Sequence, residues 1–517
     1  MPTPSMKYAA QIPGWIIAVS AGVSALWILW LSRYQPIEWD LAMLHYSAFL
    51  INEKGFILYR DIFENNLPGT FLFHSILGKT VGYDALPMRL VDFSILAGIS
   101  FASWKIIGPI SRPAAILAPS LFVGLYLFTG TTVALQRDYI GILPTAIAVF
   151  LATKKTMAPL NTALTLGALC ALSCGFKPNY ILMYPTLFFL FLRANDKIST
   201  IKRIQFFIAM GFSFVTVFSI PVIWGIFKAD YAELVHIYKT FTPIYIQSRI
   251  DLYHFNTPQE QMSELVKNQL AHMRNSLFIA APGLVWSYLN TDPNSHNRKQ
   301  ILSIGIVTFV FSFYELLAGK FWFAHLLPSY YWSVVSFSLL LTPPKKLATP
   351  ANWILAIGVI TIAAFAAYFV LSATIQKTGD ASYTASNEHI RSQKIAKYLK
   401  ENLKEGDTVQ GIDGSGDGQG SLLIARATVA TRYLEDIPLY MQPDAPATQA
   451  FRKEFLEKLN LKKPAYIVYI HNIFHPAGGN RLKEFSELSN FIDKNYDVAI
   501  LEEGDYTIYR IKSGYSR

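Results

Sequence analysis

The sequence predicts an all-α polytopic protein that crosses a membrane about eleven times and carries a small α/β domain at its C-terminal end. Three observations support this fold class. The chain has 517 residues, of which 52% are hydrophobic and 15% are charged, whereas soluble proteins carry about 25% charged residues. Apolar runs long enough to span a bilayer recur as far as residue 374. After residue 375, strand-like segments alternate with amphipathic helical ones.

The predicted spans follow from length. A transmembrane helix needs about 20 predominantly apolar residues, with a usual range of about 17–25. This criterion predicts spans near residues 13–32, 88–108, 113–130, 138–153, 160–176, 179–193, 204–227, 276–290, 300–317, 322–341 and 352–374. Their interiors are nearly free of acidic residues, with Glu315 as the main exception.

The basic residues predict the orientation of these spans, because Lys and Arg are enriched in cytoplasmic loops. With the N-terminus in the cytoplasm, the short external loops hold one base apiece, Arg137, Lys177 and Lys320, and the C-terminal domain lies outside. The cytoplasmic loops then receive Lys105 with Arg112, Lys154 with Lys155, residues 193–203, Arg298 with Lys299, and Lys345 with Lys346.

Residues 33–87 are predicted to form one large external loop with two helices at the membrane surface. The first helix begins at Asp40, and one side of it is apolar, as in helices that lie on a bilayer. The second begins at Pro68, a residue favoured in a first turn. With His74 and Lys79, it is too short and polar for a span. The apolar side of the first helix is formed by Leu41, Leu44, Ala48 and Ile51.

The segment 375–517 is predicted to be a separate external α/β domain. Residues 389–407 form an amphipathic helix, and a hairpin turn joins the last two strands. The stretch DGSGDGQGS, residues 413–421, is predicted to be a flexible loop. It has neither the Lys-Ser/Thr pair of a phosphate-binding loop nor the GxGxxG spacing. The predicted strands are 408–413, 427–433, 465–470, 497–501 and 506–511.

Charge and cysteine content exclude two classes of function. The net charge of +10 comes from basic residues dispersed among short loops, so no nucleic-acid partner is expected. The two cysteines, Cys170 and Cys174, lie on one face of an apolar helix. They cannot form a disulfide framework in an exported domain, and no histidine lies near them in the sequence to complete a metal site. They are therefore predicted to be buried, inert thiols.

Unusual polar residues gather on the external side of this topology: Glu38, Asp40, Arg60, Asp61, Arg137, Asp138, Lys177, Lys320 and His325. Each also has a structural interpretation. The acids could cap helices, as Asp often does. Arg60 and Asp61 could form a surface ion pair. The lysines could snorkel toward water, and His325 could be an ordinary interfacial histidine. If these residues were only unrelated helix caps and ion pairs, nothing would require them to lie on the same face of the membrane. Their common placement therefore favours a functional site.

The order of these segments resembles a known superfamily. An acid after the first span opens a surface helix, followed by LYRDIFENNLPGTFL, QRD, KPNY and GKFWFAHLLP. This order resembles the GT-C superfamily of polyprenyl-phosphate-dependent glycosyltransferases, in particular its protein-mannosyltransferase-like and aminoarabinose-transferase-like branches. The resemblance covers residues 1–374, and the tail resembles the external domain often appended to such proteins.

The resemblance implies a sugar donor on a polyprenyl phosphate and transfer at the outer face of a bacterial inner membrane. The acceptor would be a hydroxyl of a cell-envelope glycan such as lipopolysaccharide, of a lipid or of a protein. Asp40 matches the general base, and Asp138 matches a second acid that shapes the site. Lys320 and His325 match the region that meets the lipid phosphate, with Lys177 as a further candidate. The supporting residues are Glu38, Arg60, Asp61 and Arg137.

These residue types suit the chemistry. A carboxylate base and a cationic leaving-group site predict direct displacement with inversion. No cofactor is expected, although Glu38, Asp40 and Asp138 could hold a divalent metal. A whole-glycan ligase or polymerase would use the same topology, and a lipid or sugar flippase is a further alternative. The tyrosine-rich loop of residues 228–256 is either a lid over the site or interfacial packing.

Overall fold

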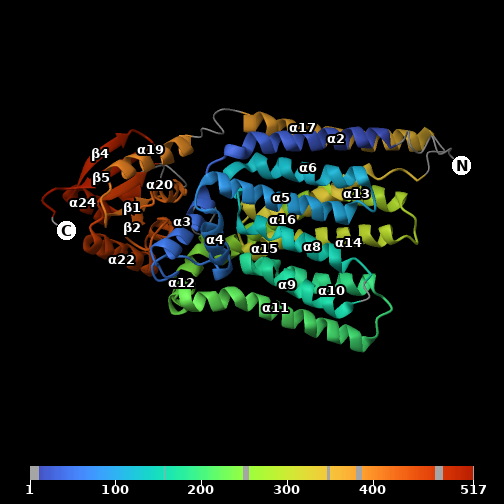
Figure 1. Ribbon diagram of the computed structural model, residues 1–517, viewed down its shortest axis with the longest axis horizontal. Coiled ribbons are helices and arrows are strands. Elements are labelled where there is room, and N and C mark those ends of the chain that lie inside the picture. Colours follow the sequence, from blue (N-terminus) through green and yellow to red (C-terminus); the bar gives the residue numbers. More distant parts are fainter. Residues whose placement is uncertain are drawn as a thin grey trace. The chain divides into compact units, whose positions relative to one another are not determined.

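The computed structural model describes residues 11–155, 158–248, 255–345, 350–379, 387–471 and 481–515, and it comprises two compact units (Figure 1). The first, here called the membrane unit, consists of Met1–Tyr34, Arg89–Ile220 and Glu264–Tyr383. The second, called the α/β unit, consists of Gln35–Met88, Pro221–Ser263 and Thr384–Arg517. The two long external loops of the predicted topology, 33–87 and 228–256, therefore belong almost entirely with the C-terminal domain, whereas the short external segments belong to the membrane unit. The predicted boundary at residue 375 falls inside a helix that runs to Gly379.

The membrane unit is built from helices, most of them long, that run alongside one another (Figure 1). They are α2 (Ile12–Leu31), α5 (Ala85–Ile107), α6 (Arg112–Thr129), α7 (Arg137–Ile140), α8 (Ile142–Ala152), α9 (Pro159–Phe176), α10 (Met183–Ala194), α11 (Thr200–Lys228), α13 (Pro258–Asn290), α14 (His296–Phe311), α15 (Tyr314–Ala318), α16 (Phe323–Ser338) and α17 (Pro350–Gly379). Some of them extend beyond the unit, because α5 begins and α11 ends in residues assigned to the α/β unit.

Seven helices in the described residues are long and apolar enough to cross a membrane: Ile12–Tyr34, Ala85–Ile107, Arg112–Val133, Pro159–Phe176, Thr200–Lys228, His296–Ala318 and Trp353–Gly379. The predicted count of eleven is therefore not confirmed. The predicted span 138–153 divides into α7 and α8 at Gly141, and the span 179–193 opens with a 3₁₀ turn, Pro178–Leu182. Such interruptions leave helices shorter than the hydrocarbon core.

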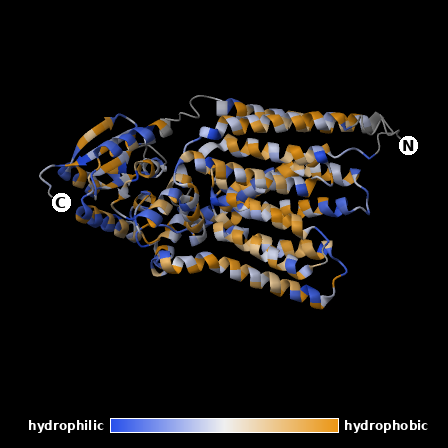
Figure 2. Cartoon of the chain, in the orientation of Figure 1, coloured by the Kyte–Doolittle hydropathy of each residue, from blue (hydrophilic) through white to orange (hydrophobic). Residues whose placement is uncertain are grey.

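The surface of the membrane unit is apolar. Hydrophobic side chains such as Ile16, Phe212 and Phe365 are more than half exposed, and hydrophobic residues line the helices along their length (Figure 2). Soluble monomers rarely expose apolar patches of more than a few hundred Å². With its long apolar helices, this chain is a multi-pass membrane protein.

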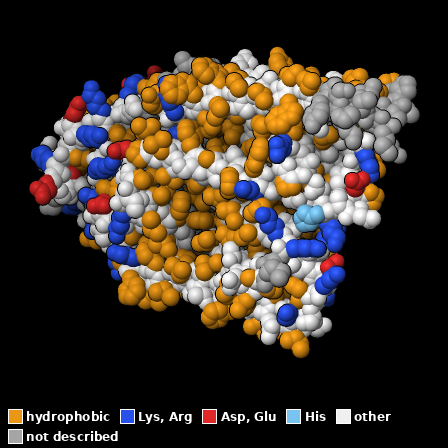
Figure 3. All heavy atoms as spheres, turned by 45° about the vertical axis from the view of Figure 1, so that its right-hand side comes forward, with side chains coloured by type: hydrophobic (Ala, Val, Ile, Leu, Met, Phe, Trp, Pro, Cys, Tyr) orange, Lys and Arg blue, Asp and Glu red, His pale blue; other side chains and the backbone are white. Residues whose placement is uncertain are grey.

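Basic loops gather at one end of the membrane unit, where Lys and Arg side chains are clustered in Figure 3. The loops contact one another there. Asn297 donates a 2.7 Å hydrogen bond to the carbonyl of Pro109, Asn195 donates to that of Lys154, and Lys299 pairs with Asp196 at 3.4 Å. This agrees with the predicted grouping of the basic loops. Lys346 lies outside the described residues.

The α/β unit contains a five-stranded sheet in the order β2-β1-β3-β5-β4. β1 pairs in parallel with β2 and β3, while β5 is antiparallel to both β3 and β4. The strands are β1 (Thr408–Ile412), β2 (Thr428–Val429), β3 (Tyr466–Ile470), β4 (Tyr496–Glu502) and β5 (Tyr506–Ile511). Each predicted strand is present, although the segment 427–433 retains only two strand residues.

Helices flank the sheet in sequence and complete the unit: α3 (Trp39–Glu53), α4 (Pro68–Val81), α12 (Tyr231–Gln247), α19 (Asn387–Asn402), α20 (Asp417–Ala425), α21 (Ile437–Tyr440), α22 (Pro446–Lys462), α23 (Arg481–Glu484) and α24 (Ser486–Asn495). The predicted loop 413–421 is wrong from Asp417 onward, because α20 begins there. Burial of Leu422 and Leu423 outweighs the low helix propensity of the glycines.

α3 is a core helix, which corrects the prediction of a surface helix. Every residue from Leu41 to Ile51 is buried, and α4 and α20 pack against it. The predicted apolar residues of α3 are buried. Its polar side is buried too: the hydroxyl of Tyr46 donates a 3.0 Å hydrogen bond to the carbonyl of Ala427. α4 begins at Pro68 as predicted and buries one side only. Part of the cover over α3 comes from α20, a segment far away in the sequence.

The segment after α11, which includes α12, packs on the same core. The ring of Phe241 in α12 lies 5.3 Å from the ring of Phe63, between centroids. Phe63 in turn lies 5.1 Å from the ring of Phe451 in α22. Arg432 forms ion pairs with Glu233 of α12 at 2.5 Å and with Glu454 at 2.7 Å. The described part of the tyrosine-rich loop is therefore packed helix in this structure. Residues 249–254 of that loop lie outside the described residues.

Candidate active site

Four polar side chains meet at one end of the membrane unit. Asp138 is in the first turn of α7, and Lys177 caps the C-terminus of α9. Tyr314 opens α15, and His325 lies in the first turn of α16. The basic loops lead into the N-terminal ends of three helices, α6, α9 and α14. Lys177 follows the C-terminal end of α9, and Tyr314 follows that of α14. The cluster therefore lies at the end of the unit opposite the basic loops.

Asp138 is fully buried and has a partner on each carboxylate oxygen. The Tyr314 hydroxyl donates a 2.8 Å hydrogen bond to Oδ1, and Lys177 Nζ lies 3.5 Å from Oδ2. The Tyr180 hydroxyl donates to the backbone carbonyl of Asp138. A buried carboxylate without partners would cost several kcal/mol, so these contacts allow Asp138 to keep its charge.

His325 is held in one tautomer. Its Nδ1 donates a 2.7 Å hydrogen bond to the carbonyl of Lys320, which leaves Nε2 as an acceptor. Nζ of Lys177 lies 3.2 Å from Nε2 and donates to it. The Trp322 ring stacks on the imidazole, with centroids 6.0 Å apart. One ammonium group thus bridges an imidazole and a carboxylate.

The charges around this cluster favour an anion. Arg137 and Lys177 act as cations on Asp138 and His325, and Lys320 joins the cluster through its backbone carbonyl, while Asp138 and Glu315 supply two carboxyl groups. Lys320 is only 5% exposed, and Glu315 is fully buried and accepts from the hydroxyl of Ser329. Cations in a water-poor site interact strongly with phosphate oxygens. The chemistry that fits is binding of a phosphate group.

The other predicted site residues belong to the α/β unit. Asp40 is in the first turn of α3 and partly exposed. Glu38 is the N-cap of the same helix, but its side chain makes no capping hydrogen bond. Arg60 and Asp61 form an ion pair at 2.9 Å, with side chains 58% and 33% exposed. Such an exposed pair contributes about 0–1 kcal/mol.

A buried network that was not predicted from the sequence includes Tyr139, the residue after Asp138. Arg89 and Asp92 of α5 form an ion pair at 2.5 Å, and both side chains are at least 97% buried. The Tyr126 hydroxyl donates to Asp92 Oδ1 at 2.6 Å, and the Tyr139 hydroxyl donates to its backbone carbonyl at 3.1 Å. The expectation of spans nearly free of acids overlooked Asp92. Its i, i+3 spacing from Arg89 was the available signal.

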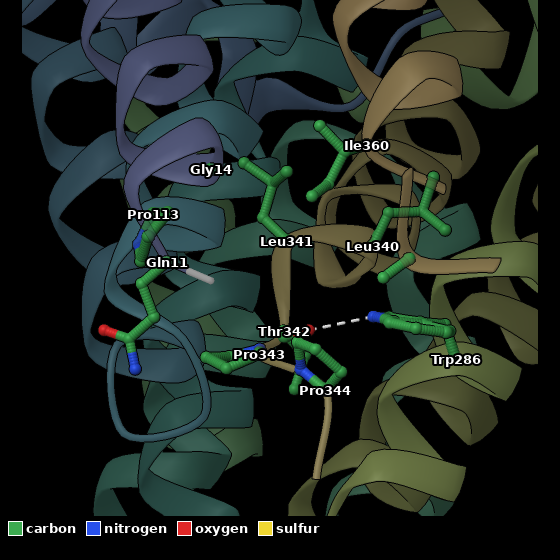
Figure 4. A pocket seen from close by; sticks show the side chains of 11 residues that line it. Gln11, Gly14, Pro113, Trp286, Leu340, Leu341, Thr342, Pro343, Pro344 and Ile360 are labelled. Atoms are coloured by element: carbon green, nitrogen blue, oxygen red, sulfur yellow. Dashed lines mark hydrogen bonds between the residues drawn. The ribbon is translucent and has the colours of Figure 1, made fainter. Parts of the chain in front are cut away.

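Two cavities elsewhere in the membrane unit involve none of these side chains. One of about 20 Å³ lies between helix ends, beside the hydrogen bond from Trp286 Nε1 to the carbonyl of Thr342 (Figure 4). A larger one, of about 620 Å³, lies between α9 and α11. Within the described residues, no group of three or more His, Cys, Asp or Glu side chains is arranged to hold a metal ion.

Comparison with solved structures shows which known proteins share this fold. The chain matches ArnT from Cupriavidus metallidurans bound to undecaprenyl phosphate with a TM-score of 0.57, at 10% identity over 97% of this chain and 98% of that one. The apo state of ArnT matches with the same TM-score over 96% and 98%. Arabinofuranosyltransferase AftD from Mycobacteria matches with a TM-score of 0.50, at 12% identity over 96% of this chain and 41% of that one.

The chain therefore shares its fold with ArnT and AftD, which agrees with the predicted GT-C-like fold. The likeness to ArnT extends over nearly the whole length of both chains. No protein-family model matches the sequence, and no curated protein matches it.

Proposed function

We propose that this protein is an inverting glycosyltransferase that moves a sugar from a polyprenyl-phosphate donor to an acceptor hydroxyl. The observation that carries the proposal is the buried contact of Lys177 with His325 and Asp138 at one end of the membrane unit. Such a site can receive the phosphate of a lipid whose tail lies in the bilayer. The ArnT structure with undecaprenyl phosphate has the same fold and supports this choice of carrier.

The proposed reaction is a single displacement. Asp40 takes the proton from the acceptor hydroxyl, whose oxygen bonds to the anomeric carbon of the sugar. The bond from that carbon to the phosphate oxygen breaks, and the phosphate leaves with the electron pair. Lys177, Lys320 and His325 stabilise the charge that develops on the phosphate. A general base in such a step contributes about 10²–10⁴-fold.

The remaining predicted residues take supporting roles in this proposal. Asp138 fixes the Lys177 ammonium, and Arg137 adds positive charge beside it. Glu38, Arg60 and Asp61 shape the segment around Asp40. The reaction needs no metal, because the leaving group's charge is met by protein cations. In the alternative, Glu38, Asp40 and Asp138 bind a divalent ion, and chelation would abolish transfer.

We propose that the basic loops face the cytoplasm of a bacterial inner membrane, in accord with the positive-inside rule. The cluster at the other end of the membrane unit then faces the periplasm. The N-terminus is cytoplasmic and the C-terminal domain periplasmic. The acceptor is a cell-envelope glycan, such as lipopolysaccharide, a lipid or a protein.

The experiment that tests this function compares cell-envelope glycans by mass spectrometry with the gene present, deleted, or replaced by Asp40→Asn. Deletion and Asp40→Asn should both remove one sugar mass from the acceptor. Asp497→Asn, a change at an exposed acid of β4, serves as the control and should retain it. Full transfer in a folded Asp40→Asn protein would exclude Asp40 as the base. Loss of a whole glycan would indicate a ligase or polymerase, and an unchanged glycan profile with altered lipid flux would indicate a flippase.

A further inference from the structure

The glycine-rich loop of residues 413–420, together with the start of α20, lies directly against the helix that carries Asp40. Gly416 is the N-cap of α20 and has a φ of +91°. A Cβ placed on Gly416 would lie 2.6 Å from each of the N, Cα and O atoms of Trp39. All three are backbone atoms, so a side chain at this position could not be accommodated by a rotamer change. The two backbones are in direct contact.

Trp39 is an unusual neighbour for this contact. It is the first residue of α3, and its φ of 52° places it in the left-handed region. That region is costly for a residue with a bulky side chain. Asp40 is the next residue, so the backbone of Trp39 sets the direction in which its carboxylate leaves the helix. A contact that holds Trp39 in this conformation therefore also determines where Asp40 lies.

The loop itself is held in place from within. Asp413 Oδ1 accepts hydrogen bonds from the N–H and hydroxyl of Ser415, at 2.8 and 2.6 Å. Asp413 Oδ2 accepts from the N–H of Gly418 at 2.8 Å. Asp417 pairs with Arg391, which also contacts Asp505 at 2.5 Å. The surface that Gly416 presents to Trp39 is therefore rigid.

Further contacts extend along α3. A Cβ on Gly420 would reach ordinary contact distances, 3.4 Å from the carbonyl of Ile37 and 3.8 Å from the Cβ of Ala42. One turn beyond, the Tyr46 hydroxyl bonds to the carbonyl of Ala427. α20 and its flanking residues thus follow α3 for two turns, and the closest approach is at the turn that holds Asp40.

We propose that the glycine-rich loop of the C-terminal domain is a positioning element for Asp40, with Gly416 as its point of contact. The proposal rests on the proposed function, in which Asp40 is the general base. It gives the C-terminal domain a role in transfer: the domain sets the place of the base without touching the sugar. A displacement of about 1 Å in such a group can cost about 10²-fold in rate.

The test compares Gly416→Ala with Gly504→Ala in the full-length protein. Gly504 has a φ of +75° and nothing within 4 Å of its added Cβ, so it reproduces the backbone strain without a contact on Trp39. We expect Gly416→Ala to reduce glycan transfer at least about tenfold, while the Kd for undecaprenyl phosphate stays within about twofold. Gly504→Ala and Gly420→Ala should transfer normally.

Amide hydrogen exchange provides a readout that does not depend on activity. In Gly416→Ala, the first-turn amides of α3, including Ala42 N–H, which bonds to the Glu38 carbonyl at 3.3 Å, should exchange about tenfold faster. Gly504→Ala should leave them unchanged. If Gly416→Ala does not fold, Asp413→Asn loosens the same loop without adding an atom against Trp39, and it should show the same pattern more weakly.

The outcomes separate the two proposals. Faster exchange with reduced transfer supports the positioning role. Unchanged exchange, or faster exchange with normal transfer while Asp40→Asn is inactive, overturns it. If Asp40→Asn itself transfers normally, the assignment of the base has failed, whatever Gly416 does to the exchange of α3.

Discussion

The hydroxyl of Tyr314 donates a 2.8 Å hydrogen bond to Oδ1 of Asp138. Lys177 approaches the other carboxylate oxygen at 3.5 Å, so a neutral donor and a cation share one buried acid. The two partners come from different helical segments, α15 and the end of α9. The contact therefore fixes both the charge and the place of the Lys177 ammonium that we propose for the lipid phosphate.

Tyr314→Phe should weaken this arrangement. The substitution removes the donor to Oδ1 from a buried carboxylate, which costs about 1–3 kcal/mol of folding stability. It should also lower transfer about tenfold, the equivalent of about 1.4 kcal/mol in the barrier. Tyr331→Phe is the matched control, because its buried hydroxyl lies 2.8 Å from the hydroxyl of Ser103. We expect the control to lose comparable stability in denaturant titrations while transfer is unchanged; equal transfer in both variants would contradict the role of Tyr314.

Lys177 can be tested without confusing binding with stability. Lys177→Met alone should destabilise the protein by about 3–5 kcal/mol, because it leaves Asp138 charged and buried. Adding Asp138→Asn removes that charge and should restore most of the stability. The double variant should still bind undecaprenyl phosphate at least about tenfold more weakly, a loss of about 1.4 kcal/mol. Wild-type affinity in the folded double variant would show that Lys177 does not contact the phosphate.

Local signals in the sequence were sufficient for much of the fold. Pro68 marks the start of α4, and the alternating pattern of residues 506–511 matches β5. Charge counting placed Lys177 and His325 on one side, and the structure brings them within 3.2 Å of each other. The sequence order alone could group these residues, because each follows or precedes a predicted span on the same side.

Long-range burial was beyond the reach of the sequence pattern. The stripe on α3 is equally suited to a bilayer or a protein core, and the choice depends on α20, which begins 364 residues after α3 ends. Tyr314 and Tyr180 both lie within predicted spans, and although Tyr180 ends the KPNY motif, nothing in the sequence indicates that both hydroxyls donate to Asp138. The count of eleven spans stays unconfirmed for a related reason, since hydropathy does not register a break such as that between α7 and α8.

His45 should make the α/β unit sensitive to acid. Burial lowers its pKa from 6.5 to about 4, although a hydrogen bond with the Gly82 carbonyl at 3.2 Å acts in the opposite direction. Between these values the unfolded chain binds more protons than the folded one, so stability falls as pH drops from 6.5 toward 4. The loss attributable to His45 is about 2–3 kcal/mol. Histidine-ring NMR should find His45 still neutral at pH 5.5, and His45→Gln should remove that part of the acid sensitivity. A His45 signal that titrates near 6.5 would contradict the burial argument.

Removing one member of the Arg89–Asp92 ion pair should reduce the stability of the protein much more than removing both. Its tyrosine partners flank the segment that carries Asp138: Tyr126 accepts from the Leu135 N–H at 3.3 Å, and Tyr139 follows Asp138 directly. Asp92→Asn keeps an acceptor for Tyr126 but leaves Arg89 buried without a counter-charge, which costs about 3–5 kcal/mol.

Combining Asp92→Asn with Arg89→Met removes both charges, so most of that loss should be recovered. A double-mutant cycle on the purified protein in micelles measures the coupling, which we expect to exceed about 2 kcal/mol. A coupling below about 0.5 kcal/mol would mean that Arg89 finds another partner once Asp92 is neutral. Because the tyrosines keep their acceptors in the double variant, the segment around Asp138 should stay in place, and transfer should recover together with stability.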